Sequence, residues 1–521
     1  MTAPPVIALA LPSPIILAPI TAPRPARWGA TVALGLLLAG CAHLHTPYEA
    51  RGIAVPAQWS ATSAANTENT ENSNGSAHAS HATAWQRPAL QDAWWKRFGD
   101  AELDRLITLA LQRNSDLHTA AWNIRKAQIA LGQSQDRQTP TLGASATANA
   151  SHNFDTGSTS RNHGVGLSLS YELDLWGKLA RQQDAAQWRL AATEQDLQSA
   201  AIALVANVAQ LYWQLAYQNA QIASGQHSLA YARRAQQLVQ ARYAAGAASG
   251  LERQEARRSV AAQEAALAQL RHNQTATRNA LALLLHEPPA SATPAAAPPW
   301  LPQEPQTLPQ HALPDIPAGL PAQVLARRPD VQAAEQRLRA TLADGDAARA
   351  SYYPAISLTG SLNSASRSLG DVLANPIGAL GASLALPFLR QQEMRLSNAA
   401  AHANYEAATL QWQKTLLTAL QEVENALSRR TQLAEQRRWL EEQLDAARQA
   451  ETLNETRYRV GATALKTWLD AQEARRSAEL ALAANQLSQL ENQLTLYKAL
   501  GGDALLPAPQ VPDVPSLMQR P

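Results

Sequence analysis

Residues 140–176 contain the feature that most constrains the fold, a pair of stretches in which apolar and polar residues alternate. Strand side chains point to opposite faces in turn, so this period gives each strand one apolar and one polar face. Each stretch has about 11 residues, the length that crosses a bilayer when the strand is tilted. The pattern predicts a β-hairpin that faces lipid. The alternation alone also fits a half-buried hairpin of a soluble sheet.

The hairpin occurs twice, because residues 354–388 repeat the alternation. The similarity extends beyond the hairpins, since Asn114 aligns with Arg328 and Gly246 aligns with Gly461. The offset between equivalent positions stays between 213 and 215 residues over this span. An offset that stays nearly constant over such a length indicates internal duplication.

The alternation assigns the strand side chains to two environments. Apolar positions are expected to face lipid, and the positions between them are expected to face the lumen of a barrel. The lipid-facing set comprises Leu167, Leu169, Leu173, Leu358, Leu384 and Leu386. The lumen-facing set comprises Ser168, Ser170, Glu172 and Asp174.

Each hairpin is followed by a long helical segment, about 178–242 in the first repeat. Leucines recur along it at seven-residue spacing, which indicates a coiled-coil seam, and the helix would be roughly 95–100 Å long. The helix before the hairpin, about 116–138, and the returning helix, about 251–286, together match this length. We therefore expect them to stack end to end against the long helix. The second repeat predicts the same arrangement over residues 329–349, 390–460 and 465–500.

The N-terminal 40 residues are typical of a secretory signal. Two arginines precede a short apolar run that ends in Leu38-Ala39-Gly40-Cys41, which matches the bacterial lipoprotein box. Cys41 is the only cysteine of the chain and is the expected site of lipidation. The alternative is an ordinary free thiol beside an uncleaved anchor.

These patterns predict six regions along the 521 residues. The Ser-, Asn- and Thr-rich part of the segment that follows the signal cannot bury a core, and proline clusters between the repeats. The regions are a signal peptide (1–40), a lipidated flexible tether (41–93), repeat 1 (94–287), a Pro-rich linker or strap (288–320), repeat 2 (321–502) and a C-terminal tail (503–521).

Four membrane strands in one chain cannot close a barrel, and lipid does not tolerate an open sheet edge. The chain is therefore expected to oligomerise. An eight-stranded barrel is filled by its own side chains, so a conducting barrel requires at least three chains. The pattern does not choose between three chains and four.

Composition and motifs favour neither an enzyme nor a nucleic-acid-binding protein. The formal net charge is only +2, and the 12 histidines are scattered. No catalytic constellation, cofactor motif or metal-ligand spacing stands out, so no cofactor or metal is expected.

The mature chain resembles the TolC-like outer-membrane factors of bacterial tripartite efflux systems, in their lipidated, NodT-like branch. The motifs that carry this resemblance, in chain order, are the lipoprotein box, the segment from Trp95 to Asp104, the stretch from Tyr171 to Lys178, the paired Arg-Tyr-x-x-Gly turns, Leu469-Asp470-Ala471-Gln472 and the stretch from Tyr497 to Gly502.

The resemblance implies a mainly α protein with membrane β-structure. A homotrimer would form a 12-stranded outer-membrane β-barrel continuous with a 12-helix periplasmic α-barrel. It also implies a passive duct for drugs or other small toxic compounds. The implied partners are outer-membrane lipid, a periplasmic adaptor (membrane fusion) protein and an inner-membrane pump of the RND or major-facilitator type.

The resemblance further assigns the two helical turns to a periplasmic gate and to adaptor docking. The residues concerned are Arg242, Tyr243, Gly246, Arg457, Tyr458, Gly461 and Asp470. From the residues alone, these turns also fit the solvated ends of a coiled coil. Many relatives carry a second carboxylate near Asp470, whereas this chain has Thr467 and Lys466 there.

Two alternative functions remain at this point. One is a periplasmic structural lipoprotein with soluble hairpins and no pore. The other is a protein-secretion duct of the same fold.

Overall fold

The computed structural model describes residues 45–49, 56, 59, 94–289, 299–309, 321 and 326–502. The chain divides into two units, residues 1–46 and 47–521, and the description below concerns the second unit. The expected signal peptide, Cys41, most of the tether and the C-terminal tail lie outside the described residues.

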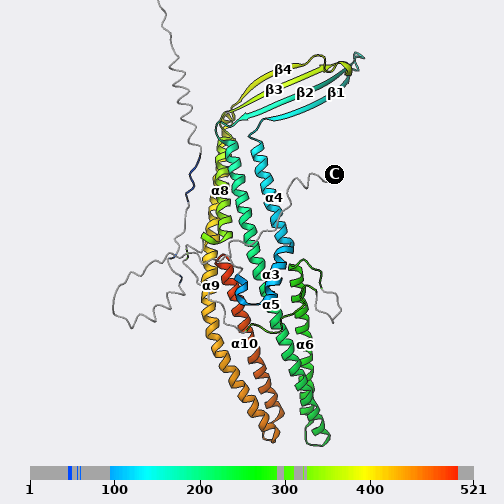
Figure 1. Ribbon diagram of the computed structural model, residues 1–521, viewed down its shortest axis with the longest axis vertical. Helices are drawn as coiled ribbons and strands as arrows, with labels where there is room; N and C mark the ends of the chain where they lie inside the picture. Colours follow the sequence, from blue (N-terminus) through cyan, green and yellow to red (C-terminus); the bar gives the residue numbers. More distant parts are fainter. Residues whose placement is uncertain are drawn as a thin grey trace, which may run out of the picture. The chain divides into compact units, whose positions relative to one another are not determined.

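Each repeat contains one short, one very long and one intermediate helix (Figure 1). Repeat 1 begins with a 3-10 turn, η3 (Trp94–Phe98), and a first helix, α3 (Ala101–Arg113). Its short, very long and intermediate helices follow as α4 (Ser115–Asp136), α5 (Lys178–Ala244) and α6 (Gly250–Leu284). In repeat 2 they are α8 (Pro329–Ala350), α9 (Gln391–Arg459) and α10 (Leu465–Ala499).

The short helices continue into a single four-stranded antiparallel sheet with the order β1-β2-β3-β4. Its strands are β1 (Thr141–His152), β2 (Thr159–Leu173), β3 (Ala355–Ser366) and β4 (Ile377–Ala385). Both hairpins lie side by side, because β2 pairs with β3 across the two repeats. The outer edges of β1 and β4 have no neighbouring strand within the sheet.

Two predicted strand ends are wrong. The strand β2 ends at Leu173, so Asp174 does not lie on a strand face; its carboxylate accepts the backbone amides of Leu179 and Ala180 at 3.0 and 2.8 Å. These bonds cap the first turn of α5. Likewise β4 ends at Ala385, because Leu386 precedes the 3-10 turn η5 (Pro387–Leu389), where proline has no amide to donate to a ladder.

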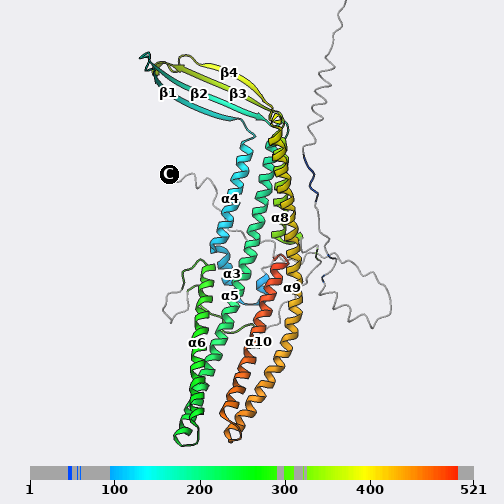
Figure 2. The ribbon, with the colours of Figure 1, turned by 180° about the vertical axis from the view of Figure 1, so that it is seen from behind.

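The long helices are lined by the shorter ones, as the lengths predicted. The helix α5 packs against α4 and α6, and α9 packs against α8 and α10 (Figures 1 and 2). The helix α8 also packs against α5, so it joins the two repeats. An apolar stretch of α5 is long enough to cross a membrane, but more than half of it is buried within the bundle. That burial is the coiled-coil seam of a bundle helix.

The main core lies where the short and intermediate helices meet, and the linker between the repeats contributes to it. Trp300, Leu301 and Leu308 are buried there. The linker is tied to α5 and α6, because Asn219 donates to the Pro305 carbonyl at 2.8 Å and Arg278 pairs with Glu304 at 2.7 Å. Residues 299–309 therefore act as a strap across the helices.

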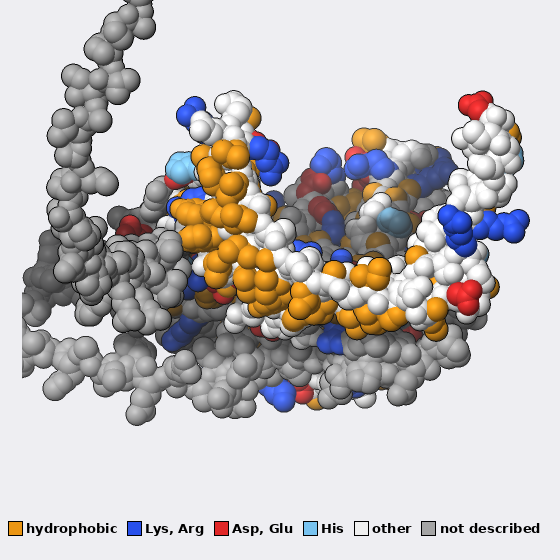
Figure 3. All heavy atoms as spheres, turned by 90° about the horizontal axis from the view of Figure 1, so that it is seen from above, with side chains coloured by type: hydrophobic (Ala, Val, Ile, Leu, Met, Phe, Trp, Pro, Cys, Tyr) orange, Lys and Arg blue, Asp and Glu red, His pale blue; other side chains and the backbone are white. Residues whose placement is uncertain are grey.

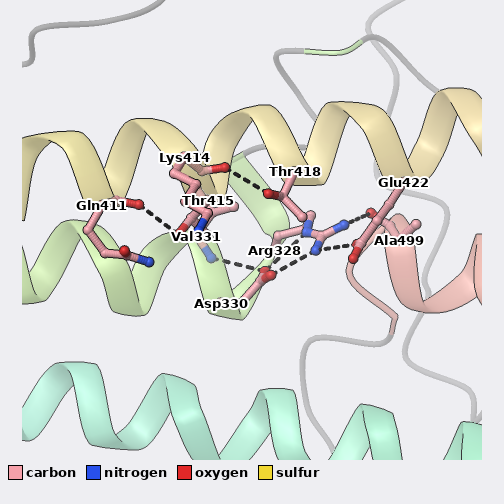
Figure 4. Close-up of polar contacts among 9 residues, drawn as sticks. All are labelled: Arg328, Asp330, Val331, Gln411, Lys414, Thr415, Thr418, Glu422 and Ala499. Atoms are coloured by element: carbon pink, nitrogen blue, oxygen red, sulfur yellow. Dashed lines mark hydrogen bonds and ion pairs between the residues drawn. The ribbon is translucent and has the colours of Figure 1, made fainter.

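Equivalent positions join the helices at this level in both repeats. In repeat 1 the Asn114 amide donates to the Leu284 carbonyl, at the end of α6, at 2.9 Å. In repeat 2 the buried Arg328 guanidinium donates to the Ala499 carbonyl, at the end of α10, at 3.0 Å. Arg328 also pairs with Asp330 and Glu422, both at 2.7 Å (Figure 4).

Candidate functional site

The helical turns at the end of the bundle away from the sheet have the same backbone geometry. Gly246 and Gly461 have φ angles of 71° and 78°, which favour glycine. The next amide in each turn donates back across it, to the carbonyl of Arg242 at 2.7 Å and of Arg457 at 2.8 Å. These are Schellman-type helix ends. Both glycines therefore close helical hairpins, α5–α6 and α9–α10.

An aromatic cluster couples the two hairpins near these turns. Tyr458 is buried and stacks on Trp468 with ring centroids 5.2 Å apart. Arg242 of α5 donates to the Tyr458 hydroxyl at 3.1 Å and lies over its ring. Tyr231 of α5 meets the Trp468 ring edge-on at 5.4 Å. The cluster thus links α5 to both helices of the second hairpin within one chain.

The other residues assigned to the gate lie apart from this cluster. Arg457 is exposed, and Tyr243 is partly exposed beneath the Arg253 guanidinium, 4.5 Å from the ring centroid. Asp470 is also exposed, and its carboxylate accepts from Lys466 at 2.5 Å. The structure therefore brings Arg242 and Tyr458 together but leaves Arg457 and Asp470 outside.

Sequence reasoning missed Trp468 and Tyr231 as members of this cluster. The available signal was the tryptophan two residues before Asp470. Burial raises the pKa of Tyr231 to about 12, with smaller contributions from Glu455 and Glu451. The tyrosine hydroxyl is therefore protonated at neutral pH and contributes packing, not charge.

A polar groove of about 840 Å³ lies beside the cluster, between the two hairpins. One wall comes from α5 and α6 and includes Arg234, Glu255 and Arg258. The other wall comes mainly from α10 and includes Lys466 and Asp470. The groove is lined by charged and hydroxyl groups, so it is a wet surface and unlike an apolar ligand pocket.

The sheet register places the predicted lipid-facing leucines on one face. Leu167 pairs with Leu362, Tyr171 pairs with Leu358, and Leu173 pairs with Ile356. Ile356 in turn pairs with Leu384. Paired residues share a face, and Leu169 is two positions from Leu167. Seen from the sheet end, hydrophobic side chains form a band along the sheet (Figure 3). Leu386 lies beyond the strand.

The opposite face of the sheet carries small and polar residues. Ser168 pairs with Gly143 and Ser361, and Ser170 pairs with Thr141 and Thr359. Ser168, Ser170 and Glu172 therefore lie together on this face. An added Cβ at Gly166 would displace the end of the Asn363 side chain, so glycine leaves room for that amide.

The boundary between sheet and helices is held by polar contacts from the stretch after β2. Glu172 pairs with Lys178 at 2.5 Å. The Trp176 indole donates to the Pro354 carbonyl at 2.7 Å, and its ring lies 5.2 Å from that of Tyr353. Aromatic rings of this kind are enriched at membrane–water interfaces. The boundary therefore marks the level at which the strands would enter a bilayer.

Within the described ranges, no group of three or more His, Cys, Asp or Glu residues could hold a metal ion.

A sheet with open edges at one end and two helical hairpins at the other are features of a channel-forming class of outer-membrane protein. Comparison with known families identifies this class. The family described as "outer membrane efflux protein" matches residues 106–286 and 320–502. The chain belongs to this family of outer-membrane channel proteins. The predicted family and fold class are confirmed.

Individual relatives match over most of their length. The pyoverdine export outer membrane protein OpmQ of Pseudomonas aeruginosa is 32% identical over 478 residues, which cover 90% of this chain and 95% of the relative. The toluene efflux pump outer membrane protein TtgC of Pseudomonas putida is 31% identical, covering 80% of this chain and 86% of TtgC. A solved membrane protein from Pseudomonas aeruginosa superposes with a TM-score of 0.74 at 29% identity, covering 89% and 99% of the two chains.

Proposed function

We propose that the chain forms the passive, homotrimeric outer-membrane duct of a tripartite efflux pump. One observation carries this proposal: a sheet whose strands are long enough to cross a bilayer, and whose two edges are open, continues into two helical hairpins. The chain also belongs to the outer membrane efflux protein family. The duct would carry drugs or other small toxic compounds from a periplasmic adaptor and an inner-membrane pump of the RND or major-facilitator type.

Surfaces at the two flanks of the chain support assembly with further copies. The strands β1 and β4 offer unpaired backbone groups, which lipid does not tolerate. Beside them, α4 exposes Trp122 and Ile129, and α9 exposes Leu410 and Leu417. Three copies would supply 12 strands and bury these side chains between neighbours, giving a barrel wide enough to conduct.

The substrates are proposed from the relatives, one of which is named for pyoverdine export and another for toluene efflux. Deletion of the gene should increase susceptibility to drugs, dyes or solvents, and the intact gene should restore resistance. Unchanged susceptibility together with loss of a secreted protein would favour a protein-secretion duct. Purified protein that forms no conducting channel would favour a structural lipoprotein.

We further propose that the link between Arg242 and Tyr458 holds the periplasmic end closed. Opening would separate α5 from α9, break the 3.1 Å hydrogen bond and widen a ring of Asp470 residues. Tyr458→Phe combined with Arg242→Ala should therefore raise single-channel conductance in planar bilayers. Tyr243→Phe is the matched control, because Tyr243 packs against Arg253 of the same hairpin. Parental conductance in the double variant would remove these residues from the gate.

Lipidation of Cys41 is proposed to assist anchoring in the outer membrane. A single lipidated residue adds only part of the attachment when a barrel already spans the membrane. Cys41→Ser should abolish metabolic labelling with palmitate but leave most of the protein in the membrane fraction. Complete release of a processed Cys41→Ser variant would contradict the barrel.

A further inference from the structure

The lipid-facing side of the sheet ends in two basic side chains on β2. The register is unbroken from Leu173 to Arg161, because each residue of β2 pairs in turn with a residue of β1 or β3. Side chains alternate between the two faces of a strand, so Arg161 and His163 share the face of Leu167 and Leu169. The apolar face therefore ends in basic groups next to the loop that joins β1 to β2.

The position of these residues along the strand places them at the edge of the membrane. The apolar band of an outer-membrane barrel is about 25 Å tall, and its strands are tilted by about 40°. At about 3.3 Å per residue, the strand from Leu173 rises roughly 25 Å to His163 and roughly 30 Å to Arg161. If Trp176 marks one interface, the two basic residues meet the headgroups of the opposite leaflet.

Arg161 is the one charged side chain at the lipid-facing positions of the four described strands. It is exposed and forms no ion pair with a described residue. The carboxylates at this end of the sheet lie off the strands: Asp155 is in the β1–β2 loop, and Asp371 is in the 3-10 turn η4 (Leu369–Asp371). The guanidinium therefore needs an anion from outside the chain.

His163 adds a second donor beside Arg161. The imidazole is half-buried, and its Nδ1 atom is enclosed without a hydrogen bond to a described residue. Nε2 is therefore the ring nitrogen that an outside ligand can reach. The neighbours across the ladder are small: Ala150 pairs with Arg161, and Ala148 and Ser366 pair with His163. The two basic side chains thus have space around them for a bulky headgroup.

The two ends of the lipid-facing side differ in chemistry. At the helix end the face carries Tyr171, and the Trp176 ring packs against Tyr353. The nearby cation Lys178 is already paired with Glu172. One boundary is therefore aromatic with its charge compensated, and the other is basic with its charge unpaired. The leaflets of an outer membrane differ in the same sense, because the outer leaflet contains lipopolysaccharide, whose lipid A headgroup carries phosphate monoesters.

We propose that Arg161 and His163 form a binding site for a phosphate of lipid A on the outside of the barrel. This inference rests on the proposed function, which places the hairpin loops at the cell exterior. The guanidinium matches a phosphate with two parallel N–H donors, and His163 adds a third through Nε2. The acyl chains would lie along the alanine and leucine rows below, so the site would hold the barrel at a fixed depth in the outer leaflet.

Lipid titration of the full-length protein in detergent tests the proposal, with bound lipids counted by native mass spectrometry. Lipid A should bind at least about fivefold more tightly than lipid A from which both phosphates have been removed. It should also bind more tightly than phosphatidylglycerol, whose phosphate diester carries less charge than a monoester. Equal binding of either lipid would overturn the proposal. Displacement of lipid A by millimolar inorganic phosphate would likewise overturn it in favour of a site for free anions.

Substitutions locate the binding. Arg161→Ala combined with His163→Ala should lower the affinity for lipid A by at least about fivefold. Arg161→Ala alone should lower it by about fivefold and provides the test if the double variant does not fold. The matched control is Arg367→Ala, which removes an exposed arginine from the loop after β3 at the same end of the sheet and should retain parental affinity. Unchanged affinity in Arg161→Ala, or an equal loss in Arg367→Ala, would overturn the site.

Planar-bilayer recordings separate this inference from the proposed function. The Arg161→Ala variant should conduct like the parent, which shows that its barrel is intact. Conductance by the parent without preference for lipid A would overturn the lipid site and leave the duct standing. Binding of lipid A that depends on Arg161, without conductance by the parent, would support the lipid site and overturn the duct.

Discussion

In repeat 1 the start of the short helix is joined to the end of the intermediate helix by the neutral side-chain amide of Asn114. In repeat 2 the buried guanidinium of Arg328 makes the equivalent junction. The helices they join are nearly equal in length: α4 and α8 both have 22 residues, α6 and α10 both have 35, and α5 and α9 have 67 and 69. Asn114 and Arg328 donate to equivalent carbonyls at 2.9 and 3.0 Å. The same geometry is thus maintained by two kinds of chemistry.

The difference follows from what surrounds each junction. The short helix α4 packs mainly on α5 and keeps only three buried residues, whereas α8 lies against both α5 and α9 and buries nine. A longer side chain is needed at Arg328 to reach Glu422 on α9 as well as the end of α10. Duplication therefore conserved the backbone, while side chains at the contacts diverged with their neighbours.

The largest expected effects come from the sheet, where the repeats should behave alike. Leu169 of repeat 1 and Leu380 of repeat 2 occupy one row of the same face, joined through Gly360. Arginine at either position should destabilise the folded barrel by about 2–4 kcal/mol if the row lies near the bilayer centre. Heat-modifiable mobility after folding into lipid vesicles measures this loss.

Ser168→Arg is the control for the face assignment, because Ser168 lies on the opposite side of β2. It should leave folding nearly unchanged and alter ion selectivity. Equal sensitivity of Ser168 and Leu169 would mean that the two faces are wrongly assigned.

Removing Arg328 should have the next largest effect. Arg328→Ala removes a donor that two carboxylates and the Ala499 carbonyl share, at a cost of about 2–3 kcal/mol. Asn114→Ala should cost about 1–2 kcal/mol, because a neutral hydrogen bond and a helix cap are lost. Thermal unfolding of each variant gives the ranking, with the exposed neighbour Arg327→Ala as the unchanged control. A larger loss of stability in Asn114→Ala than in Arg328→Ala would contradict the predicted order of the two junctions.

A smaller asymmetry is expected at the tips. The helix α6 begins with a capping box between Ser249 and Glu252, whereas α10 begins after Ala464 without a side-chain cap. Ser249→Ala should destabilise the first tip by about 1 kcal/mol, and Ala464→Ser should stabilise the second by a similar amount. Amide hydrogen exchange in the first turns of α6 and α10 reports both changes. Faster exchange in α6 of Ser249→Ala and slower exchange in α10 of Ala464→Ser would support the difference in capping between the tips. A change in the same direction in both variants would contradict it.

Acid should weaken the second junction slightly. Burial disfavours the charged form of Asp330, but bonds from Arg328 and backbone amides outweigh it and hold the pKa below the usual 3.8. A lowered pKa stabilises the folded state above pH 3.8, and this stabilisation is lost as pH falls further. Hydrogen exchange at the end of α10 should then increase below about pH 3.8.

Periodicity was sufficient to predict both hairpins, the long helices and the glycine turns, because each depends on local pattern. It failed at Asp174, where a strand-like alternation continues through Leu175 but the carboxylate is taken by the amides of α5. It also missed the Arg242–Tyr458 link and the bond from Arg328 to Ala499. Both join residues more than 170 positions apart, a separation that no local pattern encodes.

In the proposed trimer, three copies alternate these two repeats around one closed ring. Native mass spectrometry of the protein extracted from outer membranes measures the number of chains directly. A complex of three chains is expected, and it should persist after collisional activation has removed the detergent. A stable monomer or dimer, neither of which supplies enough strands for a conducting barrel, would contradict it.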